Sequence, residues 1–298
     1  MSDVRDLAKG LVRSSHTPPG LAATAVRLRD RYRRDTRSWR VLPDFVIIGA
    51  HKGGTTSLYD YLSGHPQMVP AFEKEVHYFD RRYDGDPGSY RLSFPPKARM
   101  ELTARRAGRA ITGEASPYYL SHPHIPGRVR AMVPEAKIIA LLRNPVDRAL
   151  SAFNHNRVRT PHEPLTSFAD AVERELGRLG GELDRLVADE HHDDHEYMWH
   201  CYLTRGLYAR QLQWWRAAFP TEQVLVLQSE RLGAEPGEVF AEVCEFLGLS
   251  SWTPPAFERR NANEYVPIDP ELRAKLVAWF RPHNEALFEL LGRSFDWD

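Results

Sequence analysis

Cysteine is scarce in the sequence, and long apolar runs are absent. The 298 residues include two cysteines, Cys201 and Cys244, which lie far apart in the chain. Two thiols so far apart in sequence do not suggest a disulfide framework or a zinc site. No run is apolar enough to span a membrane, and residues 1–15 lack the apolar core of a signal peptide. We therefore expect a cytoplasmic protein with no integral membrane segment.

An excess of either charge is also missing. Forty Lys and Arg residues balance forty Asp and Glu residues, so the formal net charge at pH 7 is zero. A neutral chain is poorly suited, as a whole, to bind a polyanion, and we expect no nucleic-acid partner. One basic run, RLRDRYRRDTRSWR at 27–40, departs from this balance. It could be an arm that touches nucleic acid or membrane, but such a run is more often a solvated helix or tail.

The sequence does contain a regular alternation of short apolar runs with amphipathic segments. The apolar runs, typical of buried strands, occupy 45–48, 67–70, 110–114, 137–142 and 224–227. Helical patterns occupy 55–64, 96–106, 165–190, 200–219 and 235–247, with further helices from Val146 and from Asp269, the last one ended by Gly292. Strands that alternate with helices, without an internal repeat, predict an α/β fold: three layers with a central, mostly parallel sheet flanked by helices.

The segment FVIIGAHKGGTTS, residues 45–57, reads as a strand, a glycine loop and the start of a helix. Such loops bind phosphate groups, because glycines let backbone N–H groups turn inward and the helix presents its positive end. Gly49 and Gly54 have the spacing of a Walker A loop, but Thr55 stands where that loop has lysine, and Lys52 comes earlier. We expect the loop to cradle an anion rather than ATP with magnesium; an ordinary glycine-rich turn is the less favoured interpretation.

A second candidate anion site follows the strand 137–142. Arg143 ends this strand, and open α/β sheets bind ligands at the carboxyl ends of their strands. Ser151 lies two turns into the next helix, on the face that also carries Asp147 and Arg148. Taken alone, the pair would be an arginine beside an acidic neighbour and a serine on a solvated face.

Acidic residues and a histidine alternate in AFEKEVHYFD, residues 71–80. An extended chain would place Glu73, Glu75 and His77 on one side, because side chains alternate along a strand. Carboxylates and imidazoles are common general bases, so this segment is either a catalytic edge or an acidic surface loop.

The run HHDDHE, residues 191–196, offers three histidines and three acidic residues. Adjacent residues cannot all converge on one ion, and no partner ligands stand out, so we expect an exposed loop rather than a metal site. Such a loop could border an acceptor cleft.

These motifs together resemble those of sulfotransferases that use 3′-phosphoadenosine 5′-phosphosulfate (PAPS), most closely the heparan sulfate sulfotransferase branch and its bacterial relatives. The stretch KGGTTSLY resembles the family's 5′-phosphosulfate loop, ALLRNPVDRALSAF (140–153) its 3′-phosphate motif, and KEVHYFD (74–80) the segment with its catalytic base. Further likeness lies in GEASPYYL (113–120), RGLYARQL (205–212) and FELLGRSFDW (288–297). The resemblance covers residues 41–298, which implies a sulfotransferase domain with a P-loop NTPase-like fold, preceded by a basic N-terminal arm or helix at 1–40.

The resemblance also implies roles for individual residues. Lys52 would stabilise the leaving oxygen, Glu75 would take the acceptor proton with Glu73 as the fallback base, and His77 would shape the site. PAPS would be the co-substrate, with no metal. The residues implied in binding it are Lys52, Gly53, Gly54, Thr55, Thr56, Ser57, Arg143 and Ser151.

Two positions depart from the glycosaminoglycan sulfotransferases. Ala115 stands where they usually carry a lysine, and a Lys-Gly-Arg turn in the loop that closes over PAPS is missing. Here the corresponding stretch contains Arg260 and Asn261, which we expect to replace it. Both departures weaken any inference of a heparan-like acceptor.

We therefore predict a sulfotransferase that moves a sulfuryl group from PAPS to a hydroxyl, less readily an amine, of a carbohydrate, glycolipid or natural product. One alternative is a P-loop small-molecule kinase that uses ATP, but such an enzyme would carry an acidic metal ligand where the strand 138–142 is followed by Arg143. The other is a non-catalytic nucleotide-binding protein. No motif specifies the acceptor or the oligomeric state.

Overall fold

A parallel sheet forms the centre of the molecule. The structure is a computed structural model that describes residues 19–160, 162–177, 181–258 and 267–297. Within these residues the strands are β1 (Phe45–Gly49), β2 (Gly113–Ala115), β3 (Lys137–Leu142) and β4 (Val224–Gln228). They are arranged in the order β2-β1-β3-β4, and each neighbouring pair is parallel. The carboxyl ends of three adjacent strands, β2, β1 and β3, therefore lie next to one another.

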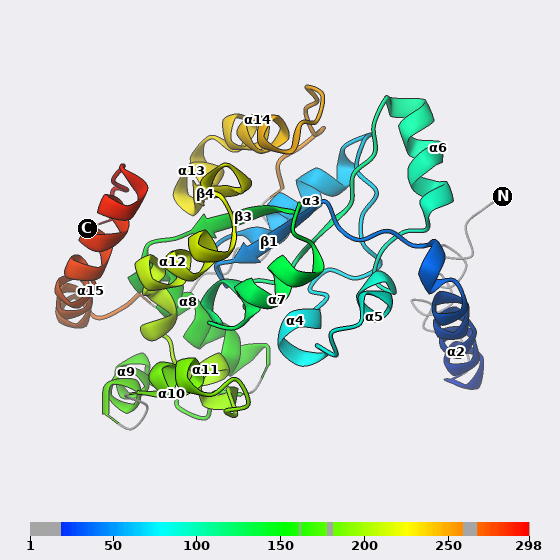
Figure 1. Ribbon diagram of the computed structural model, residues 1–298. Helices are drawn as coiled ribbons and strands as arrows, with labels where there is room; N and C mark the ends of the chain where they lie inside the picture. The colour runs from blue at the N-terminus through cyan, green and yellow to red at the C-terminus, as the bar shows by residue number, and fades with distance from the viewer. Residues whose placement is uncertain (1–18, 161, 178–180, 259–266, 298) are drawn as a thin grey trace.

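Helices cover both faces of this sheet (Figure 1). One face packs against α3 (Thr55–Gly64) and α14 (Pro236–Leu247), the other against α7 (Ile125–Met132), α12 (Tyr208–Ala218) and α15 (Pro270–Leu291). In β1, Val46 and Ile48 face the second group, and Phe45 and Ile47 face the first. A strand buried on both faces is apolar throughout. This confirms the three-layer α/β prediction.

The remaining helices surround this core. They are α2 (Pro19–Asp35), α4 (Tyr78–Arg81), α5 (Pro87–Arg91), α6 (Lys97–Ala107), α8 (Pro145–Val158), α9 (Phe168–Gly177), α10 (Glu182–Ala188), α11 (His195–His200) and α13 (Ser229–Ala234). Figure 1 shows α9, α10 and α11 grouped below α8. In the part of the chain that the structure covers, none of the helices has the length and apolar character needed to cross a membrane.

The basic run at 27–40 forms much of α2 and the turn that follows it. Several of its arginines are exposed, as expected for a solvated helix. Arg33 instead forms an ion pair with Glu73 at 3.2 Å and lies over the ring of Phe72. Arg40 is buried and donates to the backbone oxygen of Phe94 at 3.0 Å. The run is thus held against the domain at two points.

Most predicted elements are confirmed, but two predicted strands differ. The segment 67–70 is not a strand, because only Met68 forms a bridge, to Ile111. Pro66 precedes the segment and Pro70 is its last residue, and proline has no N–H to donate to a ladder. In 110–114 the strand begins only at Gly113, since the N–H of Thr112 donates instead to the side chain of Asp44 at 2.8 Å.

The helix predicted over 200–219 begins only at Tyr208. The buried carboxylate of Glu175 accepts the backbone N–H groups of Leu203 and Thr204, each at 2.7 Å, and a short 3₁₀ turn follows. These N–H groups are therefore used by a side chain that is distant in sequence. The last helix ends at Gly292, as predicted, and it continues as one helix through Pro282.

Candidate active site

The glycine loop connects β1 to α3 at the carboxyl edge of the sheet. The N–H of Ala50 donates to the oxygen of Leu141 in β3 at 2.8 Å, so the loop is fastened to the neighbouring strand. A Cβ atom at Gly53 would lie 2.4 Å from that same oxygen. Gly54 has a φ of 93°, in the left-handed region that favours glycine. Both glycines are therefore required by the loop, whose end is the N–H-rich start of the ten-residue helix α3.

Lys52 brings the loop into contact with two other elements. Its backbone is left-handed, with a φ of 70°. Its Nζ lies 3.5 Å from Nδ1 of His155 in α8, and its backbone oxygen accepts a hydrogen bond from Arg143 Nη1 at 3.2 Å. The predicted residues Lys52 and Arg143 are thus brought together, and the predicted Ser151 is buried in the same helix as His155.

The turn after Arg143 is held by Asn144. Its side-chain oxygen accepts the N–H groups of Val146 and Asp147, at 3.0 and 3.3 Å, and its own N–H donates to Glu230 at 2.8 Å. This caps the start of α8 and fixes the direction in which the strand end points. This role of Asn144 was not predicted from the sequence, although an asparagine directly before a proline is a common start signal for a helix.

The segment that contains Glu75 and His77 is not extended, so the prediction for 71–80 is wrong in this respect. Glu75 and His77 have φ values of 60° and 50°, and α4 begins at Tyr78. The reason is its attachment to the end of β2: the N–H of Glu75 donates to Ala115 O, and that of His77 to Ser116 Oγ, each at 3.1 Å. The same attachment places Glu75 at the carboxyl edge of the sheet.

Electrostatic contacts hold Glu75 ionised. Its carboxylate forms an ion pair with Lys74 and lies 3.6 Å from His77 Nε2, while His77 Nδ1 is 2.7 Å from Asp80 Oδ2. Burial favours the neutral form of each group, but the contacts prevail: those with His77 and Lys74 lower the pKa of Glu75 to about 2, and those with Asp80 and Glu75 raise the pKa of His77 to about 9. At neutral pH the pair is a carboxylate and an imidazolium.

A buried carboxyl group, that of Glu114, is connected to this segment by hydrogen bonds. It accepts hydrogen bonds from the hydroxyls of Ser116, at 2.6 Å, and Tyr90, at 2.5 Å. Burial raises the pKa of Glu114 to about 7. Because Ser116 also accepts the N–H of His77, the network links a core strand to the segment that contains Glu75 and His77. The sequence signal was present, since Glu114 is an acidic residue within a core strand.

Two histidines near Lys52 were also missed. The rings of His51 and His155 meet edge to face, with centroids 5.5 Å apart. Burial, followed by positive neighbours that include Arg205 and Lys52, lowers the pKa of His51 far below its usual value. Burial and then Lys52 lower that of His155, and Glu75 is close enough to act in the opposite direction. Two neutral rings therefore lie beside the lysine.

The structure thus brings together most of the predicted site. Lys52 with the loop, Arg143, and Glu75 with His77 come from three separate stretches of sequence and lie around the ends of β1, β3 and β2. Ser151 is buried in α8, the helix that follows Arg143. Glu73 pairs with Arg33 of α2 instead. The predicted Arg260 and Asn261 lie outside the described residues.

The sulfotransferase domain family matches residues 42–261, most of the chain, so the protein belongs to the sulfotransferase family. Among solved structures, it resembles a crystal structure of a sulfotransferase from Alicyclobacillus acidocaldarius, with 34% identity, 86% of this chain and 98% of that chain covered, and a TM-score of 0.64. This likeness confirms the α/β sulfotransferase fold.

Curated relatives confirm the resemblance to the heparan sulfate branch. The membrane-associated sulfotransferase kil1 of Dictyostelium discoideum is 28% identical, over 86% of this chain and 66% of its own length. The heparan sulfate glucosamine 3-O-sulfotransferase 3B1 of Homo sapiens is 28% identical, over 86% of this chain and 65% of its own length. The chain therefore spans about two thirds of the length of these relatives.

Proposed function

We propose that the protein transfers a sulfuryl group from PAPS to a hydroxyl, less readily an amine, of a carbohydrate, glycolipid or natural-product acceptor. One observation carries this proposal. Lys52, Arg143 and Glu75 come from segments far apart in the chain and lie at the carboxyl ends of adjacent parallel strands. Two cations and a carboxylate in this position suit an anionic donor and an acceptor that loses a proton. We also expect a cytoplasmic location and a domain that spans 41–298.

The donor is held at two ends in this proposal. The loop from Lys52 to Ser57 and the first turn of α3 bind the 5′-phosphosulfate with backbone N–H groups and hydroxyls. Arg143 and Ser151 bind the 3′-phosphate, and Arg260 and Asn261, outside the described residues, are expected to bind the nucleotide as well. Lys52 neutralises the charge that develops on the leaving phosphate oxygen, which is the role that a metal ion has in P-loop kinases.

The acceptor proton passes to Glu75. In the transfer step the acceptor oxygen forms a bond to sulfur while the bond from sulfur to the phosphate oxygen breaks, and 3′-phosphoadenosine 5′-phosphate leaves. With its pKa near 2, Glu75 is ionised but weakly basic before the donor binds. The negative donor raises the proton affinity of a nearby carboxylate, and the acceptor oxygen becomes more acidic as the bond to sulfur forms. Proton transfer therefore follows bond formation closely.

The direct test is product formation. We expect the protein, incubated with PAPS, a chelator and a panel of carbohydrate, glycolipid and phenolic hydroxyl compounds, to release 3′-phosphoadenosine 5′-phosphate in proportion to a sulfated acceptor. Mass spectrometry of the acceptor identifies the new sulfate ester. Consumption of ATP with magnesium, and no release of the nucleotide from PAPS with any acceptor, would contradict the proposal.

A further inference from the structure

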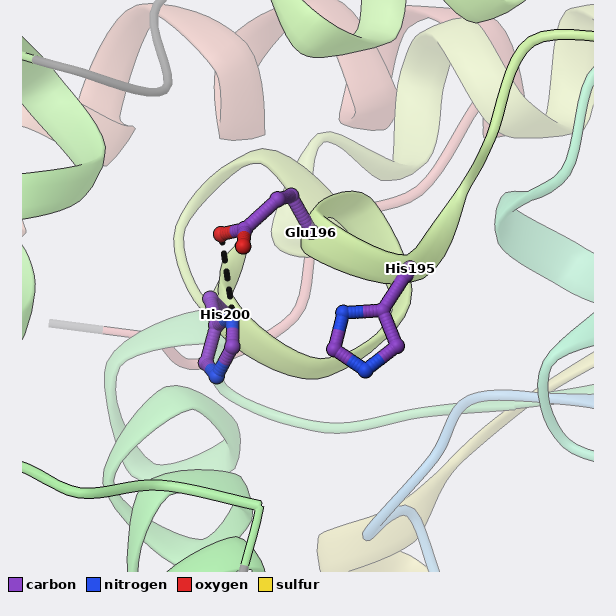
Figure 2. A group of neighbouring side chains, drawn as sticks. All are labelled: His195, Glu196 and His200. Carbon is purple, nitrogen blue, oxygen red and sulfur yellow. Dashed lines mark hydrogen bonds and ion pairs between the residues drawn. The ribbon is translucent and has the colours of Figure 1, made fainter.

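A cluster of nitrogen and oxygen ligands lies at α11, on His195, Glu196 and His200 (Figure 2). One ligand atom from each residue lies within 4.8 Å of the others. His200 is buried, His195 is exposed, and Glu196 is intermediate. The run 191–196 alone offers adjacent residues that cannot all converge on one ion. Helix α11 changes this, because it adds His200 from one turn further on.

The orientation of His200 is fixed by its hydrogen bonds. Its Nε2 lies 2.8 Å from the backbone oxygen of His162, which can only accept, so Nε2 carries a hydrogen. In the neutral ring Nδ1 then has a lone pair, and it lies 3.0 Å from a carboxylate oxygen of Glu196. The same two atoms form an ion pair when the ring carries a second proton, and they can share a cation when it does not.

The surroundings match those of a histidine that binds metal. Such a histidine usually donates its other ring N–H to a carbonyl or carboxylate, which fixes the tautomer. The carbonyl that receives it is itself held in place: the His162 N–H donates to Asn156 O at 3.0 Å, and the His162 ring stacks on Trp199 with centroids 3.8 Å apart. The Asn156 amide in turn donates to Trp199 O at 2.6 Å. The hydrogen bonds of His162 and Asn156 therefore fix the direction in which Nδ1 of His200 points.

We propose that His195, Glu196 and His200 Nδ1 bind a divalent transition-metal ion of the zinc type. Two imidazole nitrogens and one carboxylate oxygen suit zinc and its neighbours, whereas magnesium and calcium prefer oxygen ligands alone. A tetrahedral zinc site holds its ligand atoms about 3.4 Å apart. The ligand atoms that lie farthest apart must therefore move closer together, and the exposed side chain of His195 can make this movement. Water fills the fourth position.

This site is separate from the proposed sulfuryl transfer. It is connected to the active site through Asn156, the residue after His155 in α8, and through Arg81 of α4, which lies over the ring of Trp199. A bound ion would join both ends of α11 and hold that helix firmly beside α8. Metal binding at this site does not depend on PAPS or on sulfuryl transfer, so a metal-binding measurement tests the site independently of the proposed function.

The test is a calorimetric titration of chelator-treated protein with zinc chloride. The absorption spectrum of the cobalt(II)-loaded protein is a second readout, because it reports tetrahedral coordination. We expect one ion per chain. His195→Gln and Glu196→Gln should each lower the affinity by more than about tenfold, since even partners outside the ligand set cost about 10- to 100-fold. His191→Gln is the matched control, because His191 is an exposed histidine of the same stretch outside the cluster.

The outcomes separate clearly. His195 is exposed, so His195→Gln is expected to leave the fold intact, and thermal unfolding without metal checks this. Zinc should raise the melting temperature of the wild type and of His191→Gln, but not that of His195→Gln. The absence of zinc binding would overturn the proposal. Binding that His195→Gln leaves unchanged, or that His191→Gln weakens equally, would also overturn the proposal.

Discussion

At the residue scale, Glu75 and Glu73 are two carboxylates with different surroundings. Glu75 is attached to the end of β2 and contacts His77 and Lys74, whereas Glu73 pairs with Arg33 of α2. Of the two carboxylates, only that of Glu75 lies beside the strand ends where Lys52 and the glycine loop are. The assignment of the base therefore depends on where the backbone turns at Glu75, and less on the acidity of the segment.

We predict that Glu75→Gln lowers turnover by about 100- to 10,000-fold, the usual contribution of a general base, while binding of 3′-phosphoadenosine 5′-phosphate stays nearly unchanged. Steady-state kinetics and calorimetry of the same preparation measure the two effects. Glu73→Gln is the matched control and should behave like the wild type. Loss of nucleotide binding in Glu75→Gln would show that Glu75 has a binding role instead.

His77 makes stability depend on pH in a predictable direction. Its pKa is raised to about 9 in the folded protein, from 6.5 in the absence of its partners. A group whose pKa rises on folding contributes stability that is fully present below the unfolded pKa, about 6.5, and is lost as the pH rises through about 9. We expect the free energy of unfolding of the wild type to fall by about 1–3 kcal/mol over this range, relative to His77→Gln.

Urea unfolding of both proteins, at about pH 6 and about pH 10, measures this difference. The variant removes the titrating group, so pH effects of all other histidines cancel in the comparison. An identical pH dependence in the two proteins would mean that Asp80 and Glu75 do not stabilise the charged ring.

At the element scale, the glycine loop is the part of the site in which backbone geometry decides the residue. A methyl group at Gly53 would be 2.4 Å from the backbone oxygen of Leu141, which cannot move without disturbing β3. We predict that Gly53→Ala destabilises the protein by about 1–3 kcal/mol and strongly weakens nucleotide binding. Gly127→Ala in α7 is the control, because a Cβ there has open space and helical glycine is slightly unfavourable.

Thermal unfolding and calorimetry of the two variants make the comparison. Gly127→Ala is expected to be neutral or slightly stabilising and to bind the nucleotide like the wild type. Normal binding by Gly53→Ala would contradict the close packing of the loop on β3.

The elements that could be predicted are those whose signals are local in the sequence. β1, the loop and α3 were readable because an apolar run, glycines and a helical pattern are all local signals. The start of α12 was not, since Glu175 takes the N–H groups of Leu203 and Thr204 from another part of the chain. The left-handed residues Glu75 and His77 were likewise hidden, because hydrogen bonds to Ala115 and Ser116 impose their conformation.

At the scale of the whole molecule, the sheet order decides which residues meet. The alternation of strands and helices predicts a parallel sheet, but it does not give the order β2-β1-β3-β4. That order places the loop after β1 between the ends of β2 and β3, and so between Glu75 and Arg143. The candidate site was predictable residue by residue from its motifs. Among the supporting residues, Asn144 and Glu114 carried sequence signals that were overlooked, whereas His155 emerged only with the fold.

The central claim is that the loop and Arg143 bind a nucleotide with a 3′-phosphate and without metal. The most direct measurement is calorimetric binding of 3′-phosphoadenosine 5′-phosphate, compared with AMP and with ATP plus magnesium. We predict tight, metal-independent binding of the first ligand and at least about tenfold weaker binding of AMP, a difference of about 1.4 kcal/mol. A preference for ATP with magnesium would contradict the account and favour a kinase.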